Sequence, residues 1–216
     1  MSKKNNFVST EEKIVAKALE MFNERGIEYV GLREIAATLE IRVSNITYYF
    51  PTKDDLVNRL SLDLNKLNSE IVINADDLSI GDFILSFEKV FHNHLKYRCL
   101  LLIFVHLIEN NKKISARYKK TQADRNATLR SNLKVLASSG YLSIQTEHEI
   151  DFLVAGIAII ARFWISESVV SFKHLKPEEQ LRHYVGMIAR TLLPYTTAKG
   201  RKELQNLLLR FKLSNP

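Results

Sequence analysis

Histidine and carboxylate side chains could perform catalysis or bind a metal, but their spacing along this chain favours neither. His92 and His94 lie two residues apart, so on a helix they point about 200° apart and cannot share a metal ion. His148 and Asp151 would share one helix face, but such a pair at the start of a helix is typical of capping. A glycine-rich phosphate loop, a nucleophile elbow and the spacing of a zinc site are all missing. We therefore expect no enzymatic activity, no metal site and no cofactor.

The composition indicates a cytoplasmic protein. The length of 216 residues suggests one small domain and one larger one. A single cysteine, Cys99, cannot form an intramolecular disulfide, which favours a reducing compartment. The N-terminus has no apolar run typical of a secretory signal. The longest apolar stretches, 100–108 and 152–165, are shorter than the ~18–20 residues of a membrane span, so we expect buried helices and no membrane partner.

The charge is unevenly distributed. A formal net charge of +7 suggests an anionic partner. Residues 1–60 hold nine basic and nine acidic residues, whereas residues 96–134 hold ten basic and two acidic ones. We interpret this basic span as the solvated face of a long helix, with contact to DNA or an acidic partner as the alternative. Evidence for DNA binding must therefore come from a motif and not from the net charge.

Helical periodicity dominates the chain. Ser9 and Glu12 are spaced as a capping box before a first helix over 10–25, and Gly26 is placed to end it. A fourth helix carries apolar residues from Leu56 to Ile71, and 74–79 is expected to be a connector. No segment sustains period-two alternation, so we predict an all-α fold. The other expected helices cover 32–39, 43–50, 80–97, 99–110, 113–138, 147–172, 177–193 and 200–213.

The first three helices, with a tight turn between the second and third, predict a helix-turn-helix. The run Ile35-Ala36-x4-Ile41-x4-Ile46-x2-Tyr49-Phe50-x2-Lys53-x2-Leu56 resembles the signature of TetR/AcrR-family transcription regulators. The match covers about residues 9–60. The resemblance implies a DNA-binding head over residues 1–55, joined by a long helix to a helical effector-binding and dimerisation domain over residues 56–216.

The motif departs from the family pattern at several positions. Glu40 stands where the family usually has Gly, Arg42 where it has a Ser-like cap, and Thr47 where a phosphate-contacting Tyr is common. Arg42 cannot cap a helix, so the third helix is expected to begin as late as Ser44. The apolar positions of the motif are retained, and we expect both Tyr49 and Phe50 in the core.

The resemblance assigns DNA contacts to residues around the second and third helices. Arginine can bridge guanine O6 and N7, asparagine can pair with adenine, and valine can touch a thymine methyl. Tyrosine, threonine and lysine suit phosphate oxygens. The alternative is that the cations are solvated and paired with Glu34, Glu40 and Asp54. The implied DNA-binding residues are Arg33, Arg42, Val43, Ser44, Asn45, Thr47, Tyr48 and Lys53.

The expected body carries aromatic residues in apolar helices. They could line a cavity for a small apolar effector, although phenylalanine at helical spacing is more often core packing. The candidate pocket residues are Phe87, Phe91, His94, Phe104, His106 and Trp164. Arg162 interrupts the apolar run 152–165 and needs a partner: Glu167, a second subunit or an anionic ligand. We favour a structural partner.

The segments 147–172 and 177–193 carry apolar residues on more than one face, which predicts a homodimer. The residues that suggest this interface are Phe152, Leu153, Ile157, Ile160, Phe163, Ile188 and Leu192. The combined interpretation is a repressor that binds double-stranded operator DNA and is released by a small apolar effector. The alternative is a dimeric helical ligand- or protein-binding module whose head no longer binds DNA.

Overall fold

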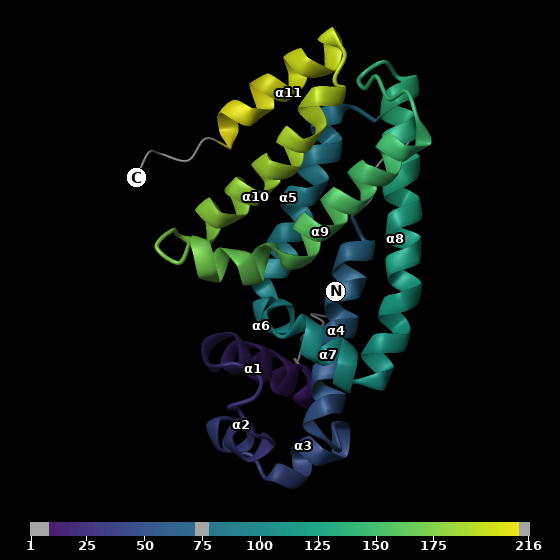
Figure 1. Cartoon of the computed structure of the whole chain (residues 1–216). Helices are drawn as coiled ribbons and strands as arrows, with labels where there is room; N and C mark the ends of the chain where they lie inside the picture. Colours follow the sequence, from purple (N-terminus) through teal and green to yellow (C-terminus); the bar gives the residue numbers. More distant parts are fainter. Residues whose placement is uncertain (1–8, 72–77, 212–216) are drawn as a thin grey trace, which may run out of the picture. The chain divides into compact units, whose positions relative to one another are not determined.

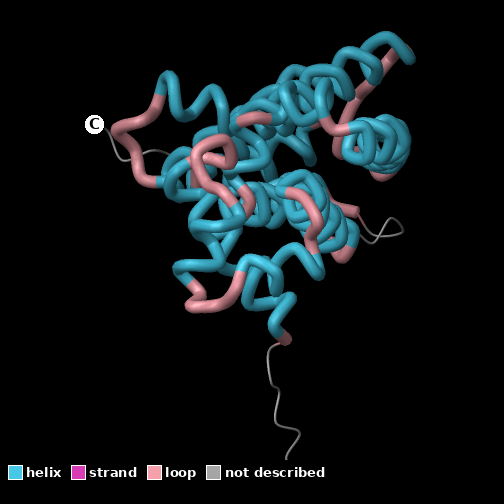
Figure 2. Tube along the Cα trace, turned by 90° about the horizontal axis from the view of Figure 1, so that it is seen from below, coloured by secondary structure: helices cyan, strands magenta, loops and turns pink. Residues whose placement is uncertain are grey.

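A computed structural model describes residues 9–71 and 78–211 (Figure 1). Helices joined by loops make up these residues, which contain no strand, so the all-α prediction is confirmed (Figure 2). The expected connector at 74–79 lies largely outside the described residues. The helices are α1 (Thr10–Arg25), α2 (Leu32–Thr38), α3 (Val43–Tyr49), α4 (Lys53–Ser69), α5 (Ile80–Lys96), α6 (Arg98–Leu102), α7 (Phe104–Asn110), α8 (Lys112–Ser138), α9 (Glu147–Ser171), α10 (Pro177–Leu192), the short 3-10 helix η2 (Leu193–Tyr195) and α11 (Ala198–Arg210).

Local signals set several helix ends. Ser9 and Glu12 form the predicted reciprocal capping box at the start of α1, and Gly26 ends this helix with a φ of 93°. Thr146 and Glu149 form a second capping box at the start of α9. Thr197 starts α11 two residues earlier than expected, because its hydroxyl accepts a hydrogen bond from the backbone N–H of Gly200.

The prediction of a single helix over 99–110 is wrong. The structure has two helices there, α6 and α7, separated at Ile103, whose φ and ψ are −108° and 25°. The residues around the break are almost continuously apolar, so their pattern contains no period that could reveal it. Because α6 and α7 are short, this segment can place Cys99, Leu100, Leu101 and Leu107 in a core.

The chain divides into two compact units. The head unit comprises residues 1–66 and 97–115, and the body unit comprises residues 67–96 and 116–216. In the body unit, α10 packs against α5 and α9, and α11 packs against α5.

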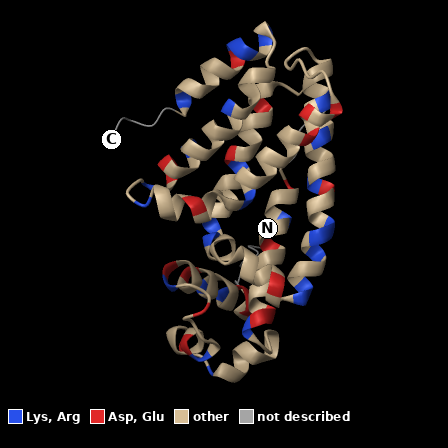
Figure 3. Cartoon of the chain, viewed as in Figure 1, with Lys and Arg blue, Asp and Glu red and all other residues tan. Residues whose placement is uncertain are grey.

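Lys and Arg side chains gather along α8, which carries eight of them and one Asp (Figure 3).

By length and composition alone, α9 is long and apolar enough to cross a membrane, and a third of its most apolar window is buried. The apolar run 152–165 lies within α9, which extends beyond it at both ends. A core helix passes the same test, and α9 packs against α5 and α10.

Candidate nucleic-acid interface and effector region

The core of the head unit orients the third helix. Ile46 is the fully buried residue of α3, and Phe50, directly after the helix, is 5% exposed. They join buried residues from α1, α2 and α4, and the contacts with α1 and α2 hold α3 by one face. The opposite face of α3 is thereby left to solvent. The buried partners are Ile14, Val15, Ala18, Met21, Phe22, Ile35, Ala36, Leu56, Val57 and Leu60.

The turn between α2 and α3 places Glu40 in the left-handed region, with a φ of 55°. The backbone N–H of Ile41 donates to the carbonyl of Ala36 at 3.0 Å, and that of Glu40 donates to Ala37 at 3.1 Å. These two bonds form a Schellman motif, in which a left-handed residue, usually glycine, ends the helix. The local geometry therefore follows the family pattern even though the residue is Glu40.

Helix α3 begins at Val43 and not as late as Ser44. Arg42 is its N-cap with an extended backbone and makes no side-chain capping bond. The backbone N–H of Asn45 donates to the carbonyl of Arg42 at 2.9 Å, so main-chain geometry suffices to start this helix.

Most of the predicted DNA-contacting side chains are exposed. Tyr48 is 81% exposed, whereas Val43 and Lys53 are half-buried. Residues at positions 44, 45 and 48 share the face of α3 opposite Ile46, since residues three and four apart are neighbours on a helix. The exposed members of the predicted set are Arg33, Arg42, Ser44, Asn45, Thr47 and Tyr48.

The ion pairs expected under the alternative reading are not formed among the described residues. Glu34 pairs with Arg25 of α1 and not with its neighbour Arg33. Neither Arg33 nor Arg42 makes an ion pair within the described part of the chain. Both guanidinium groups therefore retain their donors for an external acceptor.

Lys53 has a structural role in addition to its predicted one. Its ammonium group donates to the carbonyl of Ile27 at 2.9 Å and lies 3.4 Å from that of Glu28. These contacts fasten the start of α4 to the connection between α1 and α2. An ammonium group has three donors, so these bonds leave a donor for a phosphate oxygen.

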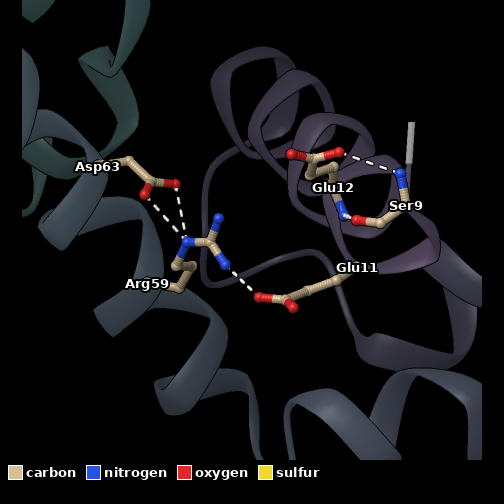
Figure 4. A network of polar contacts seen from close by, with 5 residues as sticks. All are labelled: Ser9, Glu11, Glu12, Arg59 and Asp63. Atoms are coloured by element: carbon tan, nitrogen blue, oxygen red, sulfur yellow. Dashed lines mark hydrogen bonds and ion pairs between the residues drawn. The ribbon is translucent and has the colours of Figure 1, made fainter. Parts of the chain in front are cut away.

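A charged network joins α1 to α4 within the head unit (Figure 4). The Nε of Arg59 donates to both carboxylate oxygens of Asp63, at 2.9 and 3.2 Å, and its Nη1 contacts Glu11. The hydrogen bond to Asp63 raises the pKa of Arg59, opposed by partial burial. Arg59 therefore ties the first helix of the head to the helix that follows α3.

The structure corrects one expected core residue and adds a segment to the head. Tyr49 is 39% exposed and packs edge-on against Tyr48, because Phe50 takes the buried place at the end of α3.

The segment 97–115 belongs to the head unit, where the backbone N–H of Cys99 donates to Asn23 Oδ1 at 3.0 Å. No local sequence signal links residues so far apart in the chain. Burial raises the pKa of the Cys99 thiol to about 12, so the thiol stays protonated at physiological pH.

Three of the predicted pocket residues form a buried stack in the body unit. The rings of Phe91 and Trp164 are stacked 4.7 Å apart, and Trp164 Nε1 donates to His94 Nδ1 at 3.1 Å. Because indole nitrogen is only a donor, neutral His94 carries its proton on Nε2. Burial lowers the pKa of His94 to about 3, helped by the charge of Arg125, so this histidine is neutral at physiological pH.

Of the other three predicted pocket residues, one lies beside this stack and two lie in the head unit. Phe87 is half-buried and packs edge-on against Phe91 in the body unit. Phe104 and His106 belong to α7 in the head unit, where His106 is exposed and contacts Asn110. Phe91 and Trp164 fill the space between them with their own rings, so an effector cavity beside this stack stays a prediction.

Within the described residues Arg162 pairs with a tyrosine and not with the expected Glu167. Arg162 Nε donates to the hydroxyl of Tyr118 on α8 at 2.7 Å, and Glu167, the partner considered within the chain, is exposed.

The structure revises the residues proposed for a dimer interface. Four of them are buried inside the subunit and are not available to a second one: Leu153, Ile157, Ile188 and Leu192. Their apolar character is explained by packing of α9 and α10 in the same chain. Phe152, in contrast, is 66% exposed, and Ile160 and Phe163 are half-buried.

Family models match most of the chain. A model described as "Bacterial regulatory proteins, tetR family" matches residues 14–60, which contain α1, α2 and α3. A second model, described as a TetR bacterial transcriptional repressor, matches residues 65–204. The two matches cover the helix-turn-helix and nearly all of the remaining helices.

Individual proteins agree with this assignment. The probable HTH-type transcriptional regulator YttP of Bacillus subtilis is 40% identical over 53 residues, which are 24% of this chain and 26% of that relative. A TetR-family regulator from Marinobacter aquaeolei has the same fold, with a TM-score of 0.87, 21% identity and coverage of 95% of this chain and all of that one. The ketosteroid regulator KstR2 of Mycobacterium tuberculosis is similar, with a TM-score of 0.62, 16% identity and coverage of 89% and 97%.

The exposed helix-turn-helix and the two family matches lead to one conclusion: the chain belongs to the TetR family of bacterial transcriptional regulators and carries a DNA-binding head at its N-terminus.

Proposed function

We propose that this protein is a cytoplasmic homodimeric repressor that binds a near-palindromic operator and is released by a small-molecule effector. One observation carries the proposal: α3 is held by Ile46 and exposes its opposite face, next to Arg33 and Arg42, which make no ion pairs among the described residues. A DNA-binding domain over residues 1–55 and an effector and dimerisation domain over 56–216 form part of this proposal.

The chemistry of the exposed side chains divides them into two groups. Arg33, Arg42 and Asn45 are suited to base edges in the major groove, and Val43 to a thymine methyl. The hydroxyl groups and Lys53 are suited to phosphate oxygens, which set the register of the protein on the duplex. The residues proposed to contact phosphate are Ser44, Thr47, Tyr48 and Lys53.

An exposed apolar stripe on α9 supports the dimer. Phe152, Ile159 and Val170 are 66%, 57% and 83% exposed. Their spacings of seven and eleven residues place them on one face of the helix. Large apolar side chains that are exposed along one face of a helix are unusual on a monomer surface and typical of an interface.

Release by an effector requires a difference in affinity. The effector must bind the conformation that cannot bind DNA more tightly than it binds the conformation that can. The effector then lowers the affinity for DNA by the same factor by which DNA lowers the affinity for the effector. The proposed change is in the spacing between the two recognition helices of the dimer, transmitted through α4.

The test is operator selection followed by binding titrations at two salt concentrations. Arg33→Ala and Asn45→Ala should each cost ~1–3 kcal/mol per half-site and relax the preference at one operator position. Lys53→Ala should weaken all sequences about equally and reduce the salt slope by roughly one per half-site. Lys202→Ala, an exposed lysine of α11, is the control and should change neither quantity.

Because Lys53 also holds the carbonyls of Ile27 and Glu28, its variant needs a second measurement. A thermal melt of the free protein reports loss of that contact separately from loss of a phosphate contact. Unchanged operator affinity in all three variants would show that this face of the head does not bind DNA.

A further inference from the structure

Arg162 is held in a defined orientation in the body unit. It is half-buried in α9, and its Nε donates to the hydroxyl of Tyr118 at 2.7 Å. The guanidinium carbon lies 5.8 Å from the ring centroid of Tyr118 and 5.8 Å from that of Phe163. One hydrogen bond and two aromatic rings therefore orient the planar group, which reduces the entropy lost when it binds an acceptor.

The outer edge of this guanidinium has no acceptor among the described residues. None of the described ion pairs involves Arg162, and its Nη1 and Nη2 make no hydrogen bond to any described residue. Neither atom is among the described polar atoms that are fully buried without a partner, so both keep some exposure to solvent. Two parallel N–H groups match the two oxygens of a carboxylate, the geometry of a strong charge-assisted pair.

A second cation reinforces the site. Arg125 lies seven residues after Tyr118 on α8, so both project from the same face of that helix. The charge of Arg162 lowers the pKa of Arg125, in addition to the larger effect of burial. The charge of Arg125 in turn acts on His94, which holds Trp164. The charges of two guanidinium groups, one on α8 and one on α9, thus act on each other in the body unit.

We propose that Arg162, with Arg125 and Tyr118, binds the carboxylate of an organic anion with an apolar body, and that this anion is the effector. We infer the acid group of this ligand from the oriented Nη1 and Nη2 of Arg162 and from the second guanidinium group. We infer its apolar body from the surroundings, because α9 is apolar on both sides of Arg162 and the Phe91–Trp164 stack lies in the same unit. The effector role rests on the proposed function, whereas anion binding does not.

The experiment is isothermal titration calorimetry of the full chain with octanoate and benzoate, each compared with its neutral amide. Fluorescence of Trp164, the single tryptophan, is a second readout. At least one acid should bind roughly tenfold or more tightly than its amide, as expected for a charge-assisted pair. Arg162→Met should remove this preference, and Arg162→Lys should restore part of it, since lysine keeps the charge but not the paired donors.

Lys120→Met is the matched control, because this exposed lysine lies on α8 and makes no ion pair in the described part of the chain. It should bind the acids like the wild type. Size-exclusion chromatography and a thermal melt of Arg162→Met must show an unchanged dimer and an intact fold. If Arg162→Met dissociates the dimer, the arginine is an interface residue and the proposal is wrong.

Three further results would overturn the proposal: equal binding of acids and amides, wild-type acid binding by Arg162→Met, and no binding of either acid at about 10 mM, beyond the range of specific sites. Operator affinity of Arg162→Met without any anion is measured in parallel and should equal the wild-type value. A failure of anion binding with intact operator binding would therefore leave the repressor proposal standing.

Discussion

The ammonium group of Lys113 lies 2.8 Å from Asp55 Oδ1, which joins the second residue of α8 to the first turn of α4 within the head unit. Asp55 is also the capping partner of Thr52: its Oδ2 accepts from the Thr52 backbone N–H at 3.2 Å, and the Thr52 hydroxyl accepts from the Asp55 N–H at 3.2 Å. The start of α4, which carries Lys53, is thus held from α8. This contact gives the start of the long basic helix a defined place beside the DNA-binding motif.

The first prediction concerns this contact. The hydrogen bonds from Lys113 and then Thr52 lower the pKa of Asp55 below 3.8, opposed by burial. The stabilisation is fully present above pH 3.8 and is lost as the pH falls through the lower pKa of the folded state. Lys113→Met should cost a few tenths of a kcal/mol at neutral pH, because Lys113 is largely exposed. Thr52→Ala should cost about 1 kcal/mol through loss of the cap.

Urea unfolding at neutral pH and near pH 3 measures both effects. The difference between Lys113→Met and the wild type should shrink at the acidic pH. Lys112→Met, at the neighbouring exposed residue, should show no such dependence. A difference that is the same at both pH values would contradict the ionic origin of the contact.

The second prediction concerns backbone strain at Glu40. A residue with a side chain in the left-handed region costs ~1–2 kcal/mol, and glycine relieves this cost but loses more entropy on folding. Glu40→Gly should therefore raise the free energy of unfolding by up to about 1 kcal/mol. Glu40→Ala is the control, because it removes the carboxylate while keeping Cβ. Urea unfolding checks both, and a gain in Glu40→Ala equal to that in Glu40→Gly would assign the effect to charge.

The third prediction concerns the buried imidazole of His94. Its folded-state pKa of about 3 lies below the ordinary 6.5, so between these values the unfolded chain binds a proton that the folded protein excludes. The free energy of unfolding should fall as the pH decreases from 6.5 towards 3. His94→Asn keeps an acceptor for Trp164 Nε1 but cannot be protonated, so its stability should depend less on pH.

The comparison is urea unfolding at about pH 7 and pH 4.5, where the wild type should lose on the order of 2 kcal/mol more than His94→Asn. His148→Asn, which removes an exposed histidine, is the control. Parallel losses in the wild type and in His94→Asn would show that another group causes the acid sensitivity.

The fourth prediction concerns the apolar stripe on α9. Phe152→Ser combined with Ile159→Ser should raise the dissociation constant of the dimer by roughly thirty-fold or more, the effect of losing a hot spot of about 2 kcal/mol. Analytical ultracentrifugation measures this constant. Val105→Ser changes a 54%-exposed valine of α7 and should leave it unaltered. An unaffected dimer in the double variant would place the interface elsewhere.

The sequence by itself determined the family and the helices other than the break at Ile103, because the signals for both are local. The capping box of Ser9 and Glu12 spans four residues, and the apolar positions of α1 repeat within one helix. The motif that identified the head likewise lies within about fifty consecutive residues. Its contact candidates came from the family resemblance, and the helix period accounts for the exposure of those on α3 opposite the buried Ile46.

Only the tertiary structure decided which residues meet across long distances in the chain. The segment 97–115 joins the head through contacts such as Asn23 with Cys99, which no periodic pattern encodes. The same holds for the pairing of Arg162 with Tyr118, 44 residues away. Only the packing of the helices shows which apolar residues of α9 are buried in the subunit core, as Leu153 and Ile157 are, and which are exposed, as Phe152 is. Hydrophobicity is a property of each residue, whereas burial depends on which helices pack against it, and that packing is set by the whole chain.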